Sequence, residues 1–451
     1  MFSAVGAAGA GGPSKPSLRY RSSISSPCRC TCRLRSAMSC ASLLMTADAN
    51  SGPARCPRKP RARAVSEDDW MTANRSARIP GVDIARALAV LGMFAAHILD
   101  LGDLRWTQPE TWGSVVNGHS AVTFAVLAGV SIALVTGGTA PLGAEQLVIA
   151  RHQLLVRACC IFLLGGLLQM LGTPVLIILV MYSFLFVVSL PLLRVSPPTL
   201  FVAAGVVAVV MPFLVPLIHA ALGAWGSPFN ALTDILISGG YPGLIWAAYL
   251  LLGLGIGRLD LRSPMVARRL AGFGAGIAVA SYLLSAALSG FDDGTHQTPS
   301  QFYAPSENPG EGFLWEWADL QAMLGAEPHS GTPFDVFGSA GISMLVIGLC
   351  LLLCRRPGRF SFPLRATGTM VLTVYSAHIV AIFVLCQFSE RGRDGVYPWQ
   401  GLLTWIVFVL VAVAVSTVWI ARYGRGPVEG LISSIARRSS GSRRVPARSG
   451  F

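Results

Sequence analysis

Charged residues are scarce in this chain of 451 residues. Only 13% of the residues are Asp, Glu, Lys or Arg, and 53% are hydrophobic, whereas about a quarter of an ordinary soluble domain is charged. The mean hydropathy is +0.58. These values argue against a typical soluble enzyme and indicate a protein that crosses a membrane several times.

Several signatures of soluble enzymes and metalloproteins are also missing. The chain has no nucleotide-binding loop, no soluble catalytic motif and no convincing internal repeat. Cys28, Cys30 and Cys32 lie close together, but no spaced second pair or nearby histidine accompanies them. Cysteines inside apolar runs behave as small hydrophobic residues. We therefore predict no metal site.

The formal net charge of +13 does not indicate a nucleic-acid partner. Eleven basic and four acidic residues lie in residues 1–70, and most other basic residues lie between apolar runs. The segment 1–74 is rich in Ser, Pro, Ala and Arg and lacks the apolar stretch of a secretory signal, so we expect a disordered basic tail. Because Met71 directly precedes the first apolar run, we expect the true start there.

Long apolar runs follow this tail. Runs of about 17–25 residues are long enough to span a bilayer as helices. They lie at 80–101, 114–136, 153–172, 174–193, 199–221, 239–257, 269–290, 334–354, 366–388 and 401–421. We therefore predict an all-α fold, a polytopic membrane helix bundle of about ten transmembrane helices in residues 79–429, followed by a basic cytoplasmic tail in 430–451.

The positions of the basic residues predict the topology. Arginines recur in alternate connections: Arg75 and Arg78, Arg151 and Arg157, Arg194, Arg258 to Arg269, Arg355 to Arg365, and Arg422 to Arg444. The positive-inside rule places these connections and both termini in the cytoplasm, with the protein in the inner (plasma) membrane. Residues 291–335 contain eight acidic and no basic residues, in keeping with an outer loop.

The outer loop, residues 291–333, is the longest segment between the spans. It carries Phe313, Trp315 and Trp317 among acidic residues. One interpretation is a lid over an outward-facing site, with Trp315 against the face of a sugar. The other is a belt of tryptophans at the membrane interface.

Residues 81–97 of the first span carry three ionisable residues. Asp83 is three residues before Arg86, which allows an ion pair, and His97 follows Arg86 by eleven residues, about three helical turns. All three therefore lie on one side of the helix, a stripe that must face the interior of the bundle. His97 is the candidate general base, with Arg86 and Asp83 beside it. The alternative is an interfacial ion pair and a histidine satisfied by one neighbour.

Further polar residues lie in the second and ninth spans. Asn117, His119 and Ser120 open the second span near the expected level of His97, and Tyr375 and His378 lie in the ninth. We treat these five as candidate substrate-binding residues. A helix cap at His119 and buried packing at His378 are the structural alternatives.

These residues carry a resemblance. The pattern V82-D83-I84-A85-R86-A87-L88-A89, continued to His97, resembles the first helix of acyltransferase family 3, the bacterial membrane O-acyltransferases. The stretch from Thr123 to Ile132 is similar to that family's second-helix signature. Ala125 and Ala128 depart from it, because phenylalanine and serine are usual at these positions.

The wider superfamily contains the heparan-alpha-glucosaminide N-acetyltransferases. Trp112 with Asn117-Gly118 resembles their W-N-G stretch, although the histidine that precedes it has no clear match here. An uncharacterised bacterial branch is more similar still. Its members end in G-P-[LV]-E after an arginine, as in Arg425 to Glu429, and have a late helix like the segment 368–378.

The resemblance implies a transmembrane acyltransferase. It would take an acyl group, in particular acetyl, from cytoplasmic acyl-CoA and pass it to a hydroxyl or amine of an extracytoplasmic glycan of the cell envelope. Arg86 would hold a pantetheine, a phosphate or a neighbouring carboxylate. His97 would act as base or accept the acyl group transiently. Arg151 and Arg157 would meet the donor's phosphates, unless they serve only as topology signals.

Two other classes of function remain open at this point. The same ionisable residues suit a proton-coupled transporter or flippase of a small envelope precursor. The missing inverted repeat argues against that class. A structural or assembly protein would tolerate alanine at Asp83, Arg86 and His97 without loss of function.

Overall fold

The computed structural model describes residues 78–99, 114, 116–224, 231–238, 240–289, 323–355, 358–392 and 396–440. All of them belong to one compact unit, Met71–Phe451. Every regular element in these ranges is helical, which confirms the all-α class. The predictions for the tail 1–74 and for Trp315 concern residues outside the described ranges. Most of the loop 291–333 also lies outside them.

The helices follow one another in a simple order. The α-helices are α2 (Pro80–Ile98), α3 (His119–Val135), α4 (Ala144–Gln169), α5 (Leu179–Ser189), α6 (Pro197–Ala224), α7 (Ala231–Thr233), α8 (Gly243–Gly257), α9 (Pro264–Ser289), α11 (Pro333–Leu353), α12 (Phe362–Thr369), α13 (Val371–Gln387), α14 (Leu402–Tyr423) and α15 (Pro427–Ser439). Short 3-10 turns, η2 (Leu190–Leu192) and η5 (Arg359–Ser361), and a π-helical turn, η3 (Asp234–Ser238), lie between them.

Six of the described helices are long and apolar enough to cross a membrane: α2, α4, α6, α9, α11 and α14. The pair η5–α12 and α13 passes the same test together but bends by 71°, and three shorter apolar stretches are α3, α5 with η2, and α8. The protein is therefore a multi-pass membrane protein. A helix lies over each of the ten predicted spans, but ten crossings and cytoplasmic termini remain predictions.

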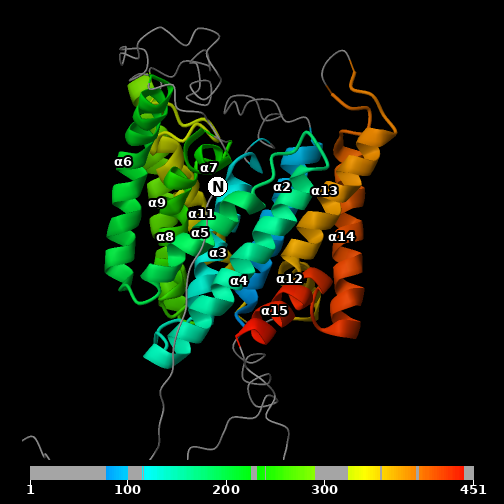
Figure 1. The fold of residues 1–451 in the computed structure, drawn as a ribbon, viewed down its shortest axis with the longest axis horizontal. Helices are drawn as coiled ribbons and strands as arrows, with labels where there is room; N and C mark the ends of the chain where they lie inside the picture. The colour runs from blue at the N-terminus through cyan, green and yellow to red at the C-terminus, as the bar shows by residue number, and fades with distance from the viewer. Residues whose placement is uncertain are drawn as a thin grey trace, which may run out of the picture. The chain divides into compact units, whose positions relative to one another are not determined.

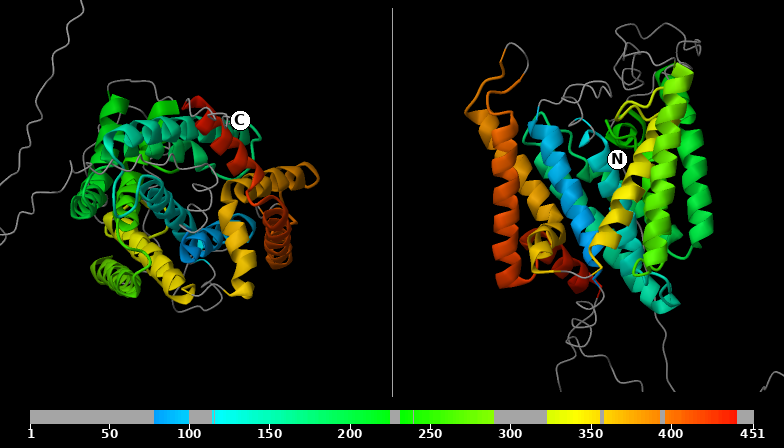
Figure 2. Two further views of the ribbon diagram at one scale, coloured as in Figure 1. Left: turned by 90° about the horizontal axis from the view of Figure 1, so that it is seen from below. Right: turned by 180° about the vertical axis from the view of Figure 1, so that it is seen from behind.

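The helix α2 lies in the interior of the bundle, between α3, α11, α12, α13 and α14 (Figures 1 and 2). Of its membrane-length segment, 67% is buried by other helices, against 6% for α14. A helix with an aspartate, an arginine and a histidine cannot face lipid without a large cost. The apolar α14 can, and it lies at the edge of the bundle. The charge content of each helix thus accounts for its place.

Glycines bring helix backbones into contact beside α2. A Cβ on Gly129 of α3 would collide with Leu250 of α8, and one on Gly253 would collide with Val126 of α3. Gly368 of α12 likewise lies directly on the carbonyl of Asp83. Close approach at small residues is the usual means of packing helices in lipid. These contacts fix α3 and α12 against the polar residues of the site.

Arg258 fastens the end of α3 to its neighbours. Its buried guanidinium donates to the carbonyls of Ala133, Thr136 and Gly138 at 3.0–3.3 Å and to the carbonyl of Leu193. The last carbonyls of a helix have no partners within the helix, and they carry partial negative charge. Arg258 therefore serves as a C-terminal cap, beyond its value as a topology signal.

The helix α4 begins earlier than its apolar run. It starts at Ala144, whereas the sequence analysis places the span at 153–172. Ala, Glu, Gln and Leu favour helix whether or not lipid surrounds them, so the helix extends beyond the hydrophobic stretch. Arg151 and Arg157, expected in a connection, thus lie on the helix itself.

The ninth predicted span is broken at Met370, between α12 and α13. The carboxylate of Glu429, at the start of α15, caps the new helix start by accepting from the backbone N–H groups of Leu372 at 2.7 Å and Thr373 at 3.1 Å. The Thr373 hydroxyl donates to the same carboxylate at 2.6 Å. The G-P-V-E motif thus closes a helix terminus inside the protein.

Candidate functional site

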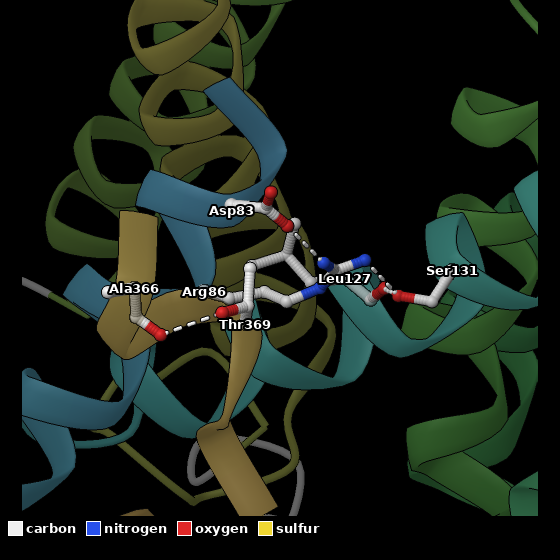
Figure 3. Close-up of polar contacts among 6 residues, drawn as sticks. All are labelled: Asp83, Arg86, Leu127, Ser131, Ala366 and Thr369. Carbon is white, nitrogen blue, oxygen red and sulfur yellow. Dashed lines mark hydrogen bonds and ion pairs between the residues drawn. The ribbon is translucent and has the colours of Figure 1, made fainter. Parts of the chain in front are cut away.

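An ion pair joins Asp83 to Arg86 inside the bundle. Nη1 of Arg86 donates to Oδ1 of Asp83 at 2.7 Å. Nη2 of Arg86 donates to the Ser131 hydroxyl of α3, also at 2.7 Å (Figure 3). Of the partners expected for Arg86, the structure thus shows the neighbouring carboxylate. Asp83 is buried, so the pair lies within the protein and also ties α2 to α3.

At the other end of α2, His97 pairs with His378 of α13. Nδ1 of His97 lies 3.0 Å from Nε2 of His378. The two rings are nearly parallel, with centroids 5.3 Å apart and an interplanar angle of 10°. Phe94 and Tyr375 pack against His378, with ring centroids at 4.5 and 5.0 Å. The structure thus brings together two residues that the sequence places in separate spans.

The surroundings of His378 favour one arrangement of the protons. Its ring lies near the carbonyls of Val374 and Tyr375, which only accept. Its Nδ1 is buried and makes no hydrogen bond with the described part of the chain. A proton on this nitrogen leaves Nε2 of His378 as an acceptor for N–H of His97 Nδ1. Which nitrogen carries a proton is inferred from partners. By this inference, Nε2 of His97 has a free lone pair.

His97 lines a small cavity of about 30 Å³. Ser120 from the start of α3 and Tyr375 from α13 also line it, as do Tyr241 and His329 from two loops. Three predicted site residues, His97, Ser120 and Tyr375, therefore share one cavity, next to His378. The volume suits one or two water molecules.

The sequence analysis did not select His329 as a site residue. Its ring packs edge-to-face on Tyr241, with centroids 5.5 Å apart, and its φ of 66° is the only positive value among the described non-glycine residues. Such backbone conformations are uncommon outside glycine and gather at functional sites. The turn-forming residues from Pro328 to Pro333 are the one feature of the sequence that points to His329. They do not indicate which helix the turn contacts.

Burial, with a smaller contribution from repulsion by His119, lowers the pKa of His329 to about 4. The loop is held rigidly at its base. The Thr332 hydroxyl accepts from the backbone of Asp335 at 3.1 Å, and the Asp335 carboxylate accepts from the backbone of Gly331 at 3.1 Å. This N-cap of α11 fixes the turn that carries His329.

His119 faces a different set of neighbours. Its Nδ1 lies 2.9 Å from the carbonyl of Asn117, and its Nε2 lies 2.6 Å from the hydroxyl of Tyr282 on α9. It does not line the cavity, although the adjoining Gly118 and Ser120 do. The Asn117 side chain does not line it either. His119 and Asn117 thus lie at the level of His97 but beside the cavity.

Arg151 and Arg157 lie far along the chain from these histidines, on α4. Nε of Arg151 donates to the carbonyl of Leu190 at 3.1 Å. Nε of Arg157 is buried and makes no hydrogen bond with the part of the chain that the structure describes.

Among the described residues, no group of three or more His, Cys, Asp or Glu side chains could hold a metal ion.

Two family models match the chain. Residues 78–283 match heparan-alpha-glucosaminide N-acetyltransferase, catalytic. Residues 312–439 match a protein of unknown function, DUF418. No curated protein matches the chain. The first match contains α2 and α3 with His97, and the second contains α13 with His378. The chain therefore combines a segment similar to the catalytic domain of heparan-alpha-glucosaminide N-acetyltransferase with a segment similar to a family of unknown function.

Proposed function

We propose that this protein is an integral-membrane acyltransferase of the inner (plasma) membrane. It takes an acetyl group from cytoplasmic acetyl-CoA and passes it to a hydroxyl or amine of an extracytoplasmic sugar or cell-envelope glycan. The family match supports acetyl transfer and acetyl-CoA as donor. The observation that carries the proposal is the His97–His378 pair beside a cavity.

His97 acts on the acceptor. Its Nε2 takes the proton from the acceptor hydroxyl or amine as the oxygen or nitrogen attacks the thioester carbonyl carbon. The new C–O or C–N bond forms, the C–S bond breaks, and CoA leaves with the electron pair of that bond and then takes up a proton. In the alternative order, Nε2 itself attacks the thioester and holds the acetyl group until the acceptor removes it.

His378 positions this base. By accepting N–H of His97 Nδ1, it fixes the ring and its tautomer, and it stabilises the positive charge that develops when Nε2 gains a proton. A histidine with a fixed partner on one nitrogen and an open second nitrogen is the arrangement that general-base catalysis requires. Phe94, whose ring is tilted against His378, and Tyr375, whose ring meets it edge-to-face, hold the pair in place.

Asp83 and Arg86 lie toward the donor side. Eleven residues of helix separate Arg86 from His97, a rise of about 16 Å, roughly half the thickness of the hydrocarbon core. An acetyl group carried on a pantetheine arm has to cover such a distance to reach His97. We propose that the remaining N–H groups of Arg86 face this route, while Asp83 and Ser131 hold its guanidinium in position.

The cavity sets a limit on how the acceptor binds. About 30 Å³ leaves room for one reacting hydroxyl or amine but not for a sugar ring. We therefore propose that only the reacting group enters, where Ser120, Tyr241 and Tyr375 offer hydroxyls. The rest of the acceptor stays outside the cavity, in keeping with a large glycan substrate.

The direct test is release of CoA thiol from acetyl-CoA by the purified protein, with hexosamines and envelope glycans as acceptors. We expect acceptor-dependent release by the wild type and loss of about 100-fold or more in His97→Ala. Leu88→Ala, on the exposed side of the same helix, is the matched control and should retain the wild-type rate.

Two outcomes would contradict the proposal. One is full acceptor-dependent release by folded His97→Ala. The other is no release by the wild type with any acceptor, combined with uptake of a solute into proteoliposomes. The second outcome would favour the carrier function.

A further inference from the structure

Helices α6, α8, α9 and α11 make up one side of the bundle (Figures 1 and 2). Helix α6 packs along α8, and α9 packs along α11. A groove of about 500 Å³ lies among these four helices, and its volume is in the range of small-molecule sites. No residue lines both this groove and the cavity at His97. The groove is therefore separate from the site described above.

Small side chains leave this space open. Ala204 and Gly205 of α6 line the groove, as does Ala340 of α11. Small residues in membrane helices usually allow a second helix to approach closely, and Gly274 does so, because a Cβ there would collide with α11. A Cβ on Gly205, in contrast, would meet no other part of the described chain within 4 Å. The space beside Gly205 is thus available to a ligand.

The lining of the groove is almost entirely hydrophobic. It includes Phe201 of α6, Leu252 of α8 and Phe337 of α11. On α9 the lining extends from Val266 to Ile277, about 16 Å of helix rise. This length is close to the hydrocarbon thickness of one leaflet, about 15 Å.

The groove is also open at its side. Phe273, which lines it on α9, is 67% exposed. Since α6, α9 and α11 are each long and apolar enough to cross a membrane, their exposed apolar surface faces lipid. A lipid chain can therefore enter the groove from the bilayer and lie along it.

One charged residue, Arg269, lines the groove, near the start of α9. Its side chain is exposed, and it forms no ion pair within the part of the chain that the structure describes. Asp260, the nearest acidic residue along the chain, accepts from the backbone N–H of Arg262 at 3.1 Å. An arginine near the end of a membrane-spanning helix extends its head to the level of the lipid phosphates. The groove thus joins a positive charge at that level to an apolar length below it.

We propose that this groove binds one acyl chain of an anionic phospholipid, with the lipid phosphate at Arg269. The apolar lining takes the chain, and the guanidinium fork matches the phosphate oxygens. By the predicted topology, the lipid belongs to the cytoplasmic leaflet. This inference goes beyond the proposed function and does not rest on acetyl transfer. A neutral lipid and a second copy of the chain are the other occupants that the experiment distinguishes.

The experiment is native mass spectrometry of the full-length protein in a mild detergent, titrated with phosphatidylglycerol or with phosphatidylcholine. Gly205→Phe fills the groove, and phenylalanine favours helix over glycine, so the variant should fold and melt near the wild-type temperature. We expect its Kd for phosphatidylglycerol to rise by about tenfold or more, because lost contact with about two methylene groups already has this effect.

Gly276→Phe is the matched control. Gly276 also lies within a helix and has open space beside it, but it is on the exposed side of α9 and does not line the groove. This variant should bind both lipids as the wild type does. Equal affinity for phosphatidylglycerol in Gly205→Phe and the wild type would overturn the groove as the site.

A second pair of variants tests the charge. The wild type should bind phosphatidylglycerol about fivefold more tightly than phosphatidylcholine. Arg269→Gln should lose this preference and still bind phosphatidylcholine, whereas Arg268→Gln, at an exposed position outside the groove, should keep it. Equal affinity of the wild type for the two lipids would show a neutral occupant and contradict the anionic headgroup.

The oligomeric state is read in the same spectra. A wild-type dimer that carries no lipid, and that Gly205→Phe dissociates, would identify a second copy as the occupant and contradict the proposal. The titrations contain no acetyl-CoA. A protein that binds the lipid but transfers no acetyl group would therefore contradict the proposed function alone, and one that transfers acetyl groups without binding the lipid would contradict this inference alone.

Discussion

At the scale of single residues, the account depends most on the nitrogen that His378 offers to His97. Removing it in His378→Leu should lower the acetyl-transfer rate by about tenfold or more, because the tautomer and orientation of His97 are no longer fixed. His378→Gln should recover part of the rate, since its amide oxygen can accept from His97 Nδ1. The two variants also differ in pH profile if His378 acts through His97.

Val380→Ala is the matched control for this pair, because Val380 lies on the exposed side of the same helix. Steady-state rates at saturating acetyl-CoA, measured over a range of pH, provide the comparison. Equal rates and pH profiles for His378→Leu, His378→Gln and the wild type would show that His378 only packs.

His329 gives a pH dependence of stability. Burial holds its pKa at about 4 in the folded protein, below the value of about 6.5 expected in the unfolded chain. The unfolded state therefore binds the proton more readily, so this histidine lowers stability as pH falls from about 6.5 towards 4 and has no effect above that range. In His329→Asn, the asparagine tolerates the same positive φ. This variant should lack the loss of stability that protonation of His329 causes.

Thermal unfolding of the purified protein between pH 4 and 7.5 measures the effect. The slope of melting temperature against pH should be smaller in His329→Asn than in the wild type. Parallel curves for the two proteins would rule out His329 as a source of acid sensitivity.

The same scale shows what the sequence could and could not predict. Asp83, Arg86 and His97 lie on one helix, so helical geometry alone predicted their ion pair and shared direction. His97–His378 and His329–Tyr241 join separate helices and loops, and no spacing along the chain encodes such contacts. His119 differs, because its neighbours Gly118 and Ser120 line the cavity beside His97 while its own ring contacts Tyr282.

At the scale of helices, the start of α13 depends on Glu429. Glu429→Ala removes the acceptor for two backbone N–H groups and the Thr373 hydroxyl. A lost helix cap costs about 1–2 kcal/mol, so the melting temperature should fall. Glu429→Gln keeps one oxygen and should lie between the two proteins, because the charge at the helix N-terminus is lost.

Glu390→Ala, at an exposed position after the same helix, is the control for the loss of one acidic residue. Melting temperatures in one detergent compare all four proteins. If Glu429→Ala melts with Glu390→Ala and the wild type, the cap does not stabilise the bent segment.

Helices also differ in how far hydropathy predicts them. A helix lies over each of the apolar runs, because lipid requires a continuous hydrophobic stretch with its backbone hydrogen bonds satisfied within the helix. They did not show that α4 begins at Ala144 or that the ninth span bends by 71° at Met370. The first depends on helix propensity outside the lipid, and the second on a carboxylate from α15, far along the chain. Local hydropathy indicates neither the start of α4 nor the bend at Met370.

At the scale of the whole molecule, the proposed function needs residues from both of the segments that match a family. His97 lies in residues 78–283, while His378 lies in residues 312–439. The two histidines that we propose to act together therefore come one from each matched segment.

Transfer across the membrane therefore tests the central claim most directly. Radiolabelled acetyl-CoA is added outside sealed inside-out vesicles that contain envelope glycan, and label on lumenal glycan is measured for the wild type, His97→Ala and the control Leu88→Ala at matched expression. The account predicts label in the lumen for the wild type and the control, and none for His97→Ala. Label that reaches lumenal glycan equally in His97→Ala, or that never reaches it in the wild type, would contradict the account.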